Sequence, residues 1–245
     1  MPNQIVNSPS SAGTEPVASN QKDLEKQAAG RASARFVTDG QIVGLGTGST
    51  AIHAIHAIGE RVRNGLKILG IPTSKRSDEL ARSLGIPLTT FEEHQEIDVT
   101  IDGADEFDPA LNLIKGGGGA LLREKIVASV TKFYVIVTDD SKQVAALGKF
   151  PLPVEVIPFA EPLLEKKIAA LGATVKLRKD ASGKPYVTDE GHHILDCSFG
   201  KIADPGALAL QLSQIPGIVE HGLFVGMANV VLIGKGSEVK ELRRT

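Results

Sequence analysis

The chain has 245 residues, of which 42% are apolar, and its 27 basic and 29 acidic side chains give a formal net charge of −2. This balance argues against an electrostatic nucleic-acid binder, which carries a strongly basic face, and no apolar run reaches the ~18 residues that a membrane-spanning helix needs. The single cysteine, Cys197, excludes an internal disulfide and fits a reducing compartment, so we expect a cytoplasmic protein that has neither nucleic acid nor membrane as a partner.

Residues 1–21 are rich in Ser, Pro, Asn and Gly and have little apolar periodicity. A segment of this composition buries too little apolar surface to offset the entropy lost on ordering, so we expect a disordered leader. It has neither the basic and apolar regions of a secretory signal nor the arginines of an organellar transit peptide.

From Lys22 onward, helical and strand-like segments alternate. Helical patterns cover 22–37, 50–62, a stretch that ends at Leu84, and 121–130, and short apolar strands are predicted at 41–45, 66–71, 97–101 and 133–137. This alternation indicates a parallel sheet that helices cover on both faces.

Beyond Phe150 the order becomes strand, helix, two strands, helix and strand, which is the split βαβ arrangement. These segments are 154–157, 161–172, 174–179, 185–198, 204–215 and 218–225. The apolar run at 228–234 is then predicted to rejoin the first sheet. We therefore expect an α/β fold in which a Rossmann-like domain (22–149 and 226–245) contains a smaller, inserted ferredoxin-like α+β (βαββαβ) domain at 150–225.

A glycine-rich loop, GLGTGST at 44–50, follows the first predicted strand and opens the next helix. Its backbone N–H groups converge on a helix N-terminus, which favours a phosphate, and Ser49 and Thr50 add hydroxyl donors. No lysine follows the last glycine, as it would in a Walker A loop, and the next strand lacks the terminal acid of a dinucleotide site. The alternative is a tight turn with a Ser or Thr cap, and we favour phosphate binding.

An acidic motif, DGADE at 102–106, follows a strongly apolar strand at the edge where α/β sheets bind ligands. Carboxylates this close repel one another and cost stability unless they serve a function or bind a cation. We favour a functional role for Asp102 and Asp105, which adjoin small residues. For Glu106 and Asp108 we expect a solvated turn with a cap.

The third motif is KGGGG at 115–119, followed by ALLREK. Four consecutive glycines are costly to order, and this run lies between a strand-like segment and a strong helix, whereas a flexible linker would have polar flanks. Backbone N–H groups in such a loop can form an oxyanion hole with Lys115 beside it. Glu124 lies in the first turns of the helix that follows; a lone helical glutamate is usually solvated, and only these neighbours make it a candidate.

Together, GTGST, DGADE and KGGGG…REK, followed by DDSKQV…LGKFPLPVEV, resemble the ribose-5-phosphate isomerase A family from about Lys22 to the end of the chain. The resemblance implies interconversion of D-ribose 5-phosphate and D-ribulose 5-phosphate in the pentose phosphate pathway, without a metal or organic cofactor, by a homo-oligomer (dimer or tetramer). It implies that Glu124 is the catalytic base. The substrate-binding residues implied by the same motifs are Thr47, Gly48, Ser49, Thr50, Asp102, Gly103, Ala104, Asp105, Lys115, Gly116, Gly117, Gly118, Lys142 and, in the first helix, Lys26.

This chemistry suits the residues themselves. Aldose–ketose isomerisation moves a proton between neighbouring carbons, and one carboxylate, Glu124, can perform both steps through a cis-enediolate. Lys115 and the glycine N–H groups can stabilise the enediolate oxygen. Asp102 and Asp105 can orient hydroxyls, open the furanose ring and carry the O1/O2 proton, and the sequence does not divide these duties between them.

Other interpretations are less favoured. A metal site would need a third, suitably spaced ligand near His53 and His56 or near the pair at 192–193, and the sequence offers none. An amino-sugar-phosphate isomerase/deaminase would be expected to use a histidine near the ring oxygen, and no histidine falls within the three motifs. A non-catalytic sugar-phosphate sensor would carry a DNA-binding helical module, for which the leader is too short, and this chain keeps Glu124.

Overall fold

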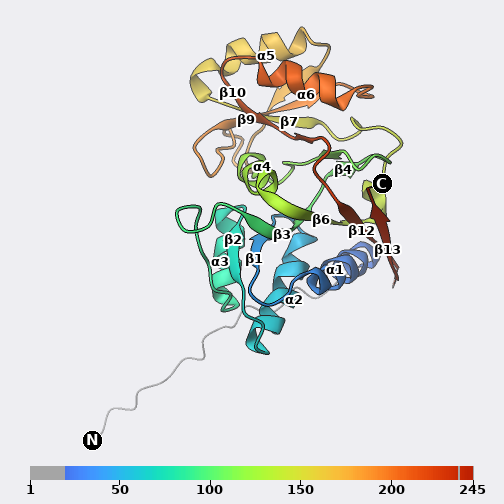
Figure 1. Cartoon of the computed structure of the whole chain (residues 1–245). Helices are drawn as coiled ribbons and strands as arrows, with labels where there is room; N and C mark the ends of the chain where they lie inside the picture. The colour runs from blue at the N-terminus through green and yellow to red at the C-terminus, as the bar shows by residue number, and fades with distance from the viewer. Residues whose placement is uncertain (1–19, 237, 245) are drawn as a thin grey trace, which may run out of the picture.

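The computed structural model describes residues 20–236 and 238–244 (Figure 1). The predicted leader lies outside the described residues except for its last two positions, of which Asn20 is the N-cap of the first helix and Gln21 is its first residue. Gln21 begins α1 (Gln21–Ser33), and the Asn20 side chain caps this helix by accepting a hydrogen bond from the N–H of Asp23 at 3.1 Å. The predicted boundary at residue 21 is therefore wrong.

The larger sheet has six strands in the order β13-β12-β6-β3-β1-β2 (Figure 1). Its members are β1 (Ile42–Leu45), β2 (Leu69–Pro72), β3 (Ile97–Gly103), β6 (Thr131–Asp139), β12 (Val230–Lys235) and β13 (Glu238–Arg243). All neighbouring pairs are parallel except β12 and β13. The predicted return of the chain to this sheet is confirmed, since β12 pairs with β6, and so is the α/β fold with a Rossmann-like parallel sheet.

Helices cover both faces of this sheet because successive strand residues point to opposite sides. Val135 and Val137 of β6 face a core shared with α1 and α2 (Ala51–Arg63). Tyr134 and Ile136 face the opposite core, to which α4 (Leu121–Ser129) contributes Ala128, and α4 lies between the two larger sheets in Figure 1. A further helix, α3 (Lys75–Ser83), packs beside β2. None of the helices within the described ranges has the length and apolarity needed to traverse a bilayer.

Some element bounds in this half of the chain differ from the prediction. The helix predicted at 22–37 ends at Ser33 and continues as a 3-10 turn, η1 (Ala34–Phe36). The strand predicted from residue 66 begins at Leu69. Strand β13 has no counterpart among the predicted strands because most of its side chains are charged, a composition that suits an exposed sheet edge and hides any apolar alternation.

The smaller sheet has four antiparallel strands in the order β10-β7-β9-β8. Its strands are β7 (Leu152–Val156), β8 (Thr174–Leu177), β9 (His193–Ser198) and β10 (Ile218–His221), and its helices are α5 (Glu161–Ala169) and α6 (Pro205–Ser213). Their order along the chain is the predicted βαββαβ, and the helices bury Leu164 and Leu212 against Val154 and Leu195 of the sheet. The division into domains at residues 150 and 225 stays a prediction.

Two strands predicted in this region are shorter than expected. The strand predicted at 185–198 is confined to β9, because residues 180–192 make turns of their own. The strand predicted at 218–225 breaks at Gly222, which passes so close to the Lys115 carbonyl that a Cβ would overlap it. Beyond this break, β11 (Leu223–Phe224) pairs with β5 (Leu113–Ile114) and β5 with β4 (Glu106–Phe107) in a third sheet.

Glu106 and Asp108 do not form the solvated turn predicted for them. Glu106 is 3% exposed, and its carboxylate accepts hydrogen bonds from the N–H groups of Gly148 (2.9 Å) and Phe150 (2.5 Å). Asp108 does cap a turn, since it accepts a hydrogen bond from the N–H of Asn112 at 2.9 Å, but it is buried. Protein donors therefore engage both carboxylates, mainly through backbone N–H groups.

Candidate active site

The three motifs meet at the carboxyl ends of β1 and β3, where the loops that follow parallel strands converge on one edge of the sheet. They line one cavity together with the segment after β6. The lining residues are Thr47, Gly48, Ser49, Thr50, Gly103, Ala104, Asp105, Lys115, Gly116, Gly117, Gly118, Glu124 and Lys142. Among the described residues, this lining contains every predicted site residue except Asp102 and Lys26, and it contains no histidine.

The glycine-rich loop connects β1 to α2 and is held in place by contacts with β3 and with Thr73. Gly46 passes so close to β3 that a Cβ would overlap backbone atoms of Asp102, and the Thr47 hydroxyl lies 2.7 Å from that of Thr73. Thr50, the N-cap of α2, makes no side-chain capping hydrogen bond. The N–H groups of Ile52 and His53 already donate to the carbonyl oxygens of Gly48 and Thr50, both at 3.1 Å. The N–H groups that precede Ile52 are therefore the ones that can donate to an anion, which the helix dipole also favours.

Asp102 lies beneath the cavity at the end of β3, with 0% of its surface exposed. Its Oδ1 accepts hydrogen bonds from the N–H groups of Thr47 (3.0 Å) and Gly103 (2.8 Å). Its Oδ2 accepts one from the hydroxyl of Tyr134 at 3.0 Å and lies 3.0 Å from Nζ of Lys115. Both carboxylate oxygens are thus engaged by protein groups, and Asp102 fixes the glycine-rich loop and Lys115 relative to each other.

Lys115 is the buried cation of the site, with 1% of its side chain exposed. Its Nζ lies 3.0 Å from Asp102 and 3.2 Å from Oε1 of Glu124, and it also donates to the carbonyl oxygen of Gly103. Burial acts to lower the pKa of Lys115, but the negative charges of Asp102 and Glu124 outweigh it and raise that pKa. The ammonium group therefore stays charged beside the cavity.

Glu124 lies in the first turn of α4 and is 4% exposed. Its Oε1 contacts Lys115, whereas its Oε2 is buried and has no hydrogen-bond partner within the described part of the chain. Burial raises the pKa of Glu124 to about 8; the charge of Lys115 acts against this rise, and that of Asp102 adds to it. A buried carboxylate with one unpartnered oxygen on a cavity wall is able to exchange a proton with a ligand there.

Asp105 joins the acidic motif to the glycine run. This half-buried residue accepts a hydrogen bond from the N–H of Gly117 on its Oδ2 at 2.6 Å. A Cβ at Gly117 would overlap this carboxylate, so the close approach requires glycine. Unlike Asp102, Asp105 lines the cavity directly and can contact a ligand.

The two predicted outlying lysines occupy different places. Lys142 lies in a 3-10 turn, η2 (Asp140–Lys142), directly after β6, and lines the cavity. Lys26 lies on α1, which packs against β6 and β12, and Lys26 does not line the cavity. Across the described ranges, no group of three or more His, Cys, Asp or Glu side chains is arranged to hold a metal ion.

Three residues outside the motifs also contact the site. The Tyr134 hydroxyl reaches Asp102, and the Arg178 guanidinium and the Tyr186 hydroxyl donate to carbonyl groups of the glycine run. Tyr134 and Asp102 are 32 positions apart, and Arg178 is more distant still from the glycines. No local pattern in the sequence indicates these contacts, because they arise only when strands and connections far apart in the chain come together.

Comparison with known proteins gives a consistent result. A sequence model of ribose 5-phosphate isomerase A (phosphoriboisomerase A) matches residues 69–238. The ribose-5-phosphate isomerase A of Parvibaculum lavamentivorans is 50% identical over 227 residues, which cover 89% of this chain and 98% of that protein. The protein of that name from a Synechococcus species is 52% identical over 226 residues, with coverage of 91% and 98%.

Solved structures agree in fold over the same length. A D-ribose-5-phosphate isomerase in complex with phospho-erythronic acid superposes with a TM-score of 0.89 at 37% identity, over 92% of this chain and 100% of the other. Ribose 5-phosphate isomerase A from Methanocaldococcus jannaschii gives 0.85 at 40% identity, with coverage of 90% and 98%. The chain, in which all three motifs surround one cavity, therefore belongs to the ribose 5-phosphate isomerase A family and is an isomerase.

Proposed function

We propose that this isomerase interconverts D-ribose 5-phosphate and D-ribulose 5-phosphate with Glu124 as the base. One observation carries the assignment of the base. Oε2 of Glu124 is buried and, among the described residues, unpartnered on the wall of the cavity, while Oε1 lies 3.2 Å from the Lys115 ammonium group. A carboxylate held in this way can take a proton from carbon and return it to the neighbouring carbon.

The substrate phosphate rests on the N-terminus of α2. Ser49 and Thr50 supply hydroxyl donors, and the N–H groups that precede Ile52 at the start of the helix supply backbone donors. Lys142 adds positive charge on the cavity wall, and Lys26 is proposed as a further cation approaching from α1. This placement leaves the reacting carbons of the sugar toward Glu124 and Lys115.

The proton transfer then proceeds in two halves. Glu124 takes the proton from C2 of the open-chain aldose, the C–H electron pair forms the C1=C2 double bond, and O1 becomes an oxyanion. After a proton moves from O2 to O1, O2 forms the carbonyl of the ketose and Glu124 returns its proton to C1. Every proton and electron pair is exchanged between the substrate and side chains of this protein, so we propose that neither a metal nor an organic cofactor takes part.

The surrounding groups divide the remaining work. Lys115 and the N–H groups of the glycine run stabilise the oxyanion. Loss of one such donor typically raises the activation free energy by roughly 3–4 kcal/mol. Asp105, which lines the cavity, orients hydroxyls, opens the furanose ring and carries the O1/O2 proton. Asp102 acts from beneath the cavity through Lys115, because both of its oxygens are already engaged.

The wider setting is also a proposal. The family membership supports a role in the pentose phosphate pathway, a cytoplasmic location and a homo-oligomer, either dimer or tetramer. Exposed apolar side chains in the smaller sheet's helical layer, such as Phe159 (95% exposed) and Leu210 (62% exposed), support self-association. The βαββαβ order of residues 152–221 supports a separate inserted domain.

The test is conversion of ribose 5-phosphate by the purified full-length chain in EDTA. We expect the wild type to turn over and Glu124→Gln to lose a factor of about 10²–10⁴ in kcat, the usual contribution of a positioned general base. Binding is measured separately by calorimetry with phospho-erythronic acid, whose carboxylate resembles the enediolate in charge. Glu165→Gln, at an exposed glutamate on α5, is the matched control and should turn over normally.

Each contrary outcome overturns a separate part of the proposal. Normal kcat in Glu124→Gln removes Glu124 from the role of base. No conversion by a folded wild type that binds phospho-erythronic acid removes the reaction itself. Activity that disappears in EDTA and returns with an added metal ion removes the cofactor-free mechanism.

A further inference from the structure

The connection between β8 and β9 lies against the outer side of the glycine run. Arg178 follows β8 directly, and its Nη1 donates hydrogen bonds to the carbonyl oxygens of Gly116 at 2.8 Å and Gly117 at 3.1 Å. Further along, the hydroxyl of Tyr186 donates to the carbonyl oxygen of Gly118 at 3.4 Å. Successive carbonyl groups of the run are thus held by one connection that belongs to the smaller sheet.

Arg178 is held firmly in this position. Its Nε donates to Oδ2 of Asp196 at 3.0 Å and its Nη2 donates to Oδ1 at 2.5 Å, which makes a bidentate ion pair. Only 13% of the arginine side chain is exposed. The guanidinium carbon lies 6.0 Å from the centre of the Tyr186 ring, and the backbone N–H of Arg178 donates to Ile194 at 2.8 Å. These contacts fix the position of Nη1 of Arg178, the group that donates to the glycine run.

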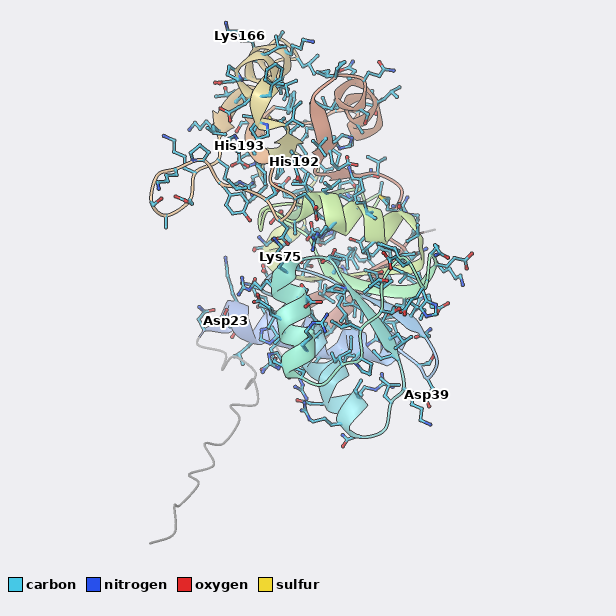
Figure 2. All side chains as sticks on the ribbon, turned by 90° about the vertical axis from the view of Figure 1, so that its left-hand side faces the viewer. Asp23, Asp39, Lys75, Lys166, His192 and His193 are labelled. Carbon is cyan, nitrogen blue, oxygen red and sulfur yellow. The ribbon has the colours of Figure 1, made fainter. Side chains whose placement is uncertain are left out.

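The far end of the same connection is braced against the helices of the larger sheet. Asp189 accepts a hydrogen bond from the N–H of Lys75 at 2.8 Å, at the start of α3. Figure 2 shows Lys75 at the end of α3 that faces the segment carrying His192. Glu190 pairs with Arg123 at 2.5 Å, directly beside Glu124 on α4. The connection between β8 and β9 is therefore held at one end by the glycine run and at the other by α3 and α4.

The planarity of the peptide bond transmits this contact to the cavity. The carbonyl of Gly116 and the N–H of Gly117 belong to one trans peptide unit, so they point in opposite directions. When Arg178 holds the carbonyl, the N–H is directed at the cavity, where it donates to Asp105 at 2.6 Å. The next peptide unit relates the Gly117 carbonyl, also bound by Arg178, to the N–H of Gly118.

Glycine peptides need such an external hold. Without side chains, Gly117 and Gly118 have access to many backbone conformations, and a rotated peptide plane would present a carbonyl oxygen to an oxyanion. The positive charge of Arg178 at the carbonyl end also polarises each peptide unit so that its N–H becomes a stronger donor. Direction and strength of the donors therefore both depend on Arg178.

We propose that Arg178 is a positioning residue for the isomerisation, which aligns and polarises the N–H groups of Gly117 and Gly118 toward Asp105 and the developing enediolate. The inference rests on the proposed function, because it assumes that the cavity stabilises an oxyanion. Arg178 does not itself line the cavity, and it contacts the lining residues Gly116 and Gly117 only at their carbonyl oxygens. Its effect therefore falls on turnover rather than on phosphate binding.

The experiment compares Arg178→Ala, Arg178→Lys and Tyr186→Phe in the full-length chain, with Arg82→Gln as control. Arg82 is 67% exposed in an ion pair with Asp78 and does not line the active-site cavity. Losing a whole oxyanion donor costs about 10²–10³ in kcat, so for misaligned donors in Arg178→Ala we expect roughly a tenfold or larger loss, with KM for ribose 5-phosphate changed by less than about threefold. Added guanidinium should restore part of that kcat.

The other two variants should lower kcat by smaller factors than Arg178→Ala does. Arg178→Lys keeps the charge but loses the two-pronged geometry, so its kcat should fall between those of wild type and Arg178→Ala. Tyr186→Phe should lower kcat by about twofold, because its hydrogen bond is long and weak. If Arg178→Ala fails to fold, Arg178→Lys with its intact charge still tests the proposal through the ratio of kcat to KM effects.

The outcomes separate this inference from the proposed function. Unchanged kcat in folded Arg178 variants overturns the positioning role, as does a loss of activity that follows only the loss of folded protein in urea titrations. Glu124→Gln is assayed in parallel. If that variant turns over normally, the proposed mechanism itself has failed; if it is inactive while Arg178→Ala is normal, only the present inference has failed.

Discussion

The Lys115 ammonium group lies 3.2 Å from Oε1 of Glu124, and both side chains are almost completely buried. This arrangement leaves Oε2 of the same carboxylate unpartnered among the described residues. Burial raises the pKa of Glu124 and the lysine charge opposes that rise, so the ion pair keeps this pKa lower than burial alone would make it, which suits the proposed role as base. A general base works best when its pKa is close to the pH at which it acts.

Lys115→Met should therefore damage both stability and catalysis. The substitution keeps the length of the side chain but leaves Asp102 and Glu124 buried without their cation, which typically costs about 3–5 kcal/mol of the free energy of unfolding. We also expect kcat/KM near pH 7 to fall, because the pKa of Glu124 rises further. Urea titration and initial rates measure the two effects.

The control for this variant is Lys132→Met, at a lysine whose side chain is 58% exposed and pairs with Glu96 and Asp98. An exposed pair of this kind contributes about 0–1 kcal/mol, so the control should unfold and turn over nearly as the wild type does. Equal losses in the two variants would contradict the role given to the buried Lys115.

The pH dependence of kcat/KM should report the raised pKa of Glu124. The base must be deprotonated to accept the C2 proton, and burial raises its pKa to about 8. The rate should consequently increase about tenfold per pH unit below this value and level off above it. Rates from pH 5.5 to 9 test this expectation, with buffer ionic strength held constant. A profile that is flat from pH 5.5 to 8 would show that another group, or an ordinary carboxylate, limits the reaction.

The cavity lining was predictable because its residues lie in short motifs directly after strands. Parallel strands bring their carboxyl ends to one edge, so a loop such as 44–50 and an acid such as Asp105 could be assigned to one site from their positions alone. The role of Asp102 could not be read in this way. One of the hydrogen bonds that hold the Asp102 carboxylate comes from Tyr134. The position of Tyr134 on β6 indicates a buried side chain but does not indicate a hydrogen-bond partner on β3.

The fold shows the same contrast between local and distant causes. The βαββαβ order follows from local periodicity and turn residues, which the chain carries in each segment. The break between β10 and β11 arises instead from the close passage of Gly222 over Lys115, a residue more than a hundred positions earlier. Strand β13 pairs with β12 although its charged sequence resembles a solvated tail. Tertiary contacts override local preference at both places.

Tyr134→Phe isolates the hydrogen bond beneath the cavity. The ring stays in its core, but Asp102 loses a donor at 3.0 Å, and a hydrogen bond to a charged group typically contributes about 1.5–3 kcal/mol. We expect the free energy of unfolding in urea to fall by this amount and kcat to fall less than in Lys115→Met. Thr138→Val, also on β6, removes a buried hydroxyl that has no partner in the described structure and should leave stability unchanged or higher. A similar loss in both variants would contradict the role of the Tyr134 hydroxyl.

Gly46→Ala tests the close approach of the glycine-rich loop at 44–50 to β3. A Cβ at Gly46 would overlap backbone atoms of Ile101 and Asp102, and because these atoms belong to a central strand they cannot move aside as a flexible side chain would. Overpacking of this kind typically costs about 1–3 kcal/mol, and here the displaced loop also loses its hydrogen bond from the Thr47 N–H to Asp102. We expect a lower free energy of unfolding together with a higher KM for ribose 5-phosphate. Gly206→Ala, in α6, is the matched control: its nearest neighbour would be 3.4 Å away, and alanine in a helix is about 0.5–1 kcal/mol more favourable than glycine. If Gly46→Ala binds ribose 5-phosphate as tightly as the control, the phosphate does not rest on the loop that Gly46 positions.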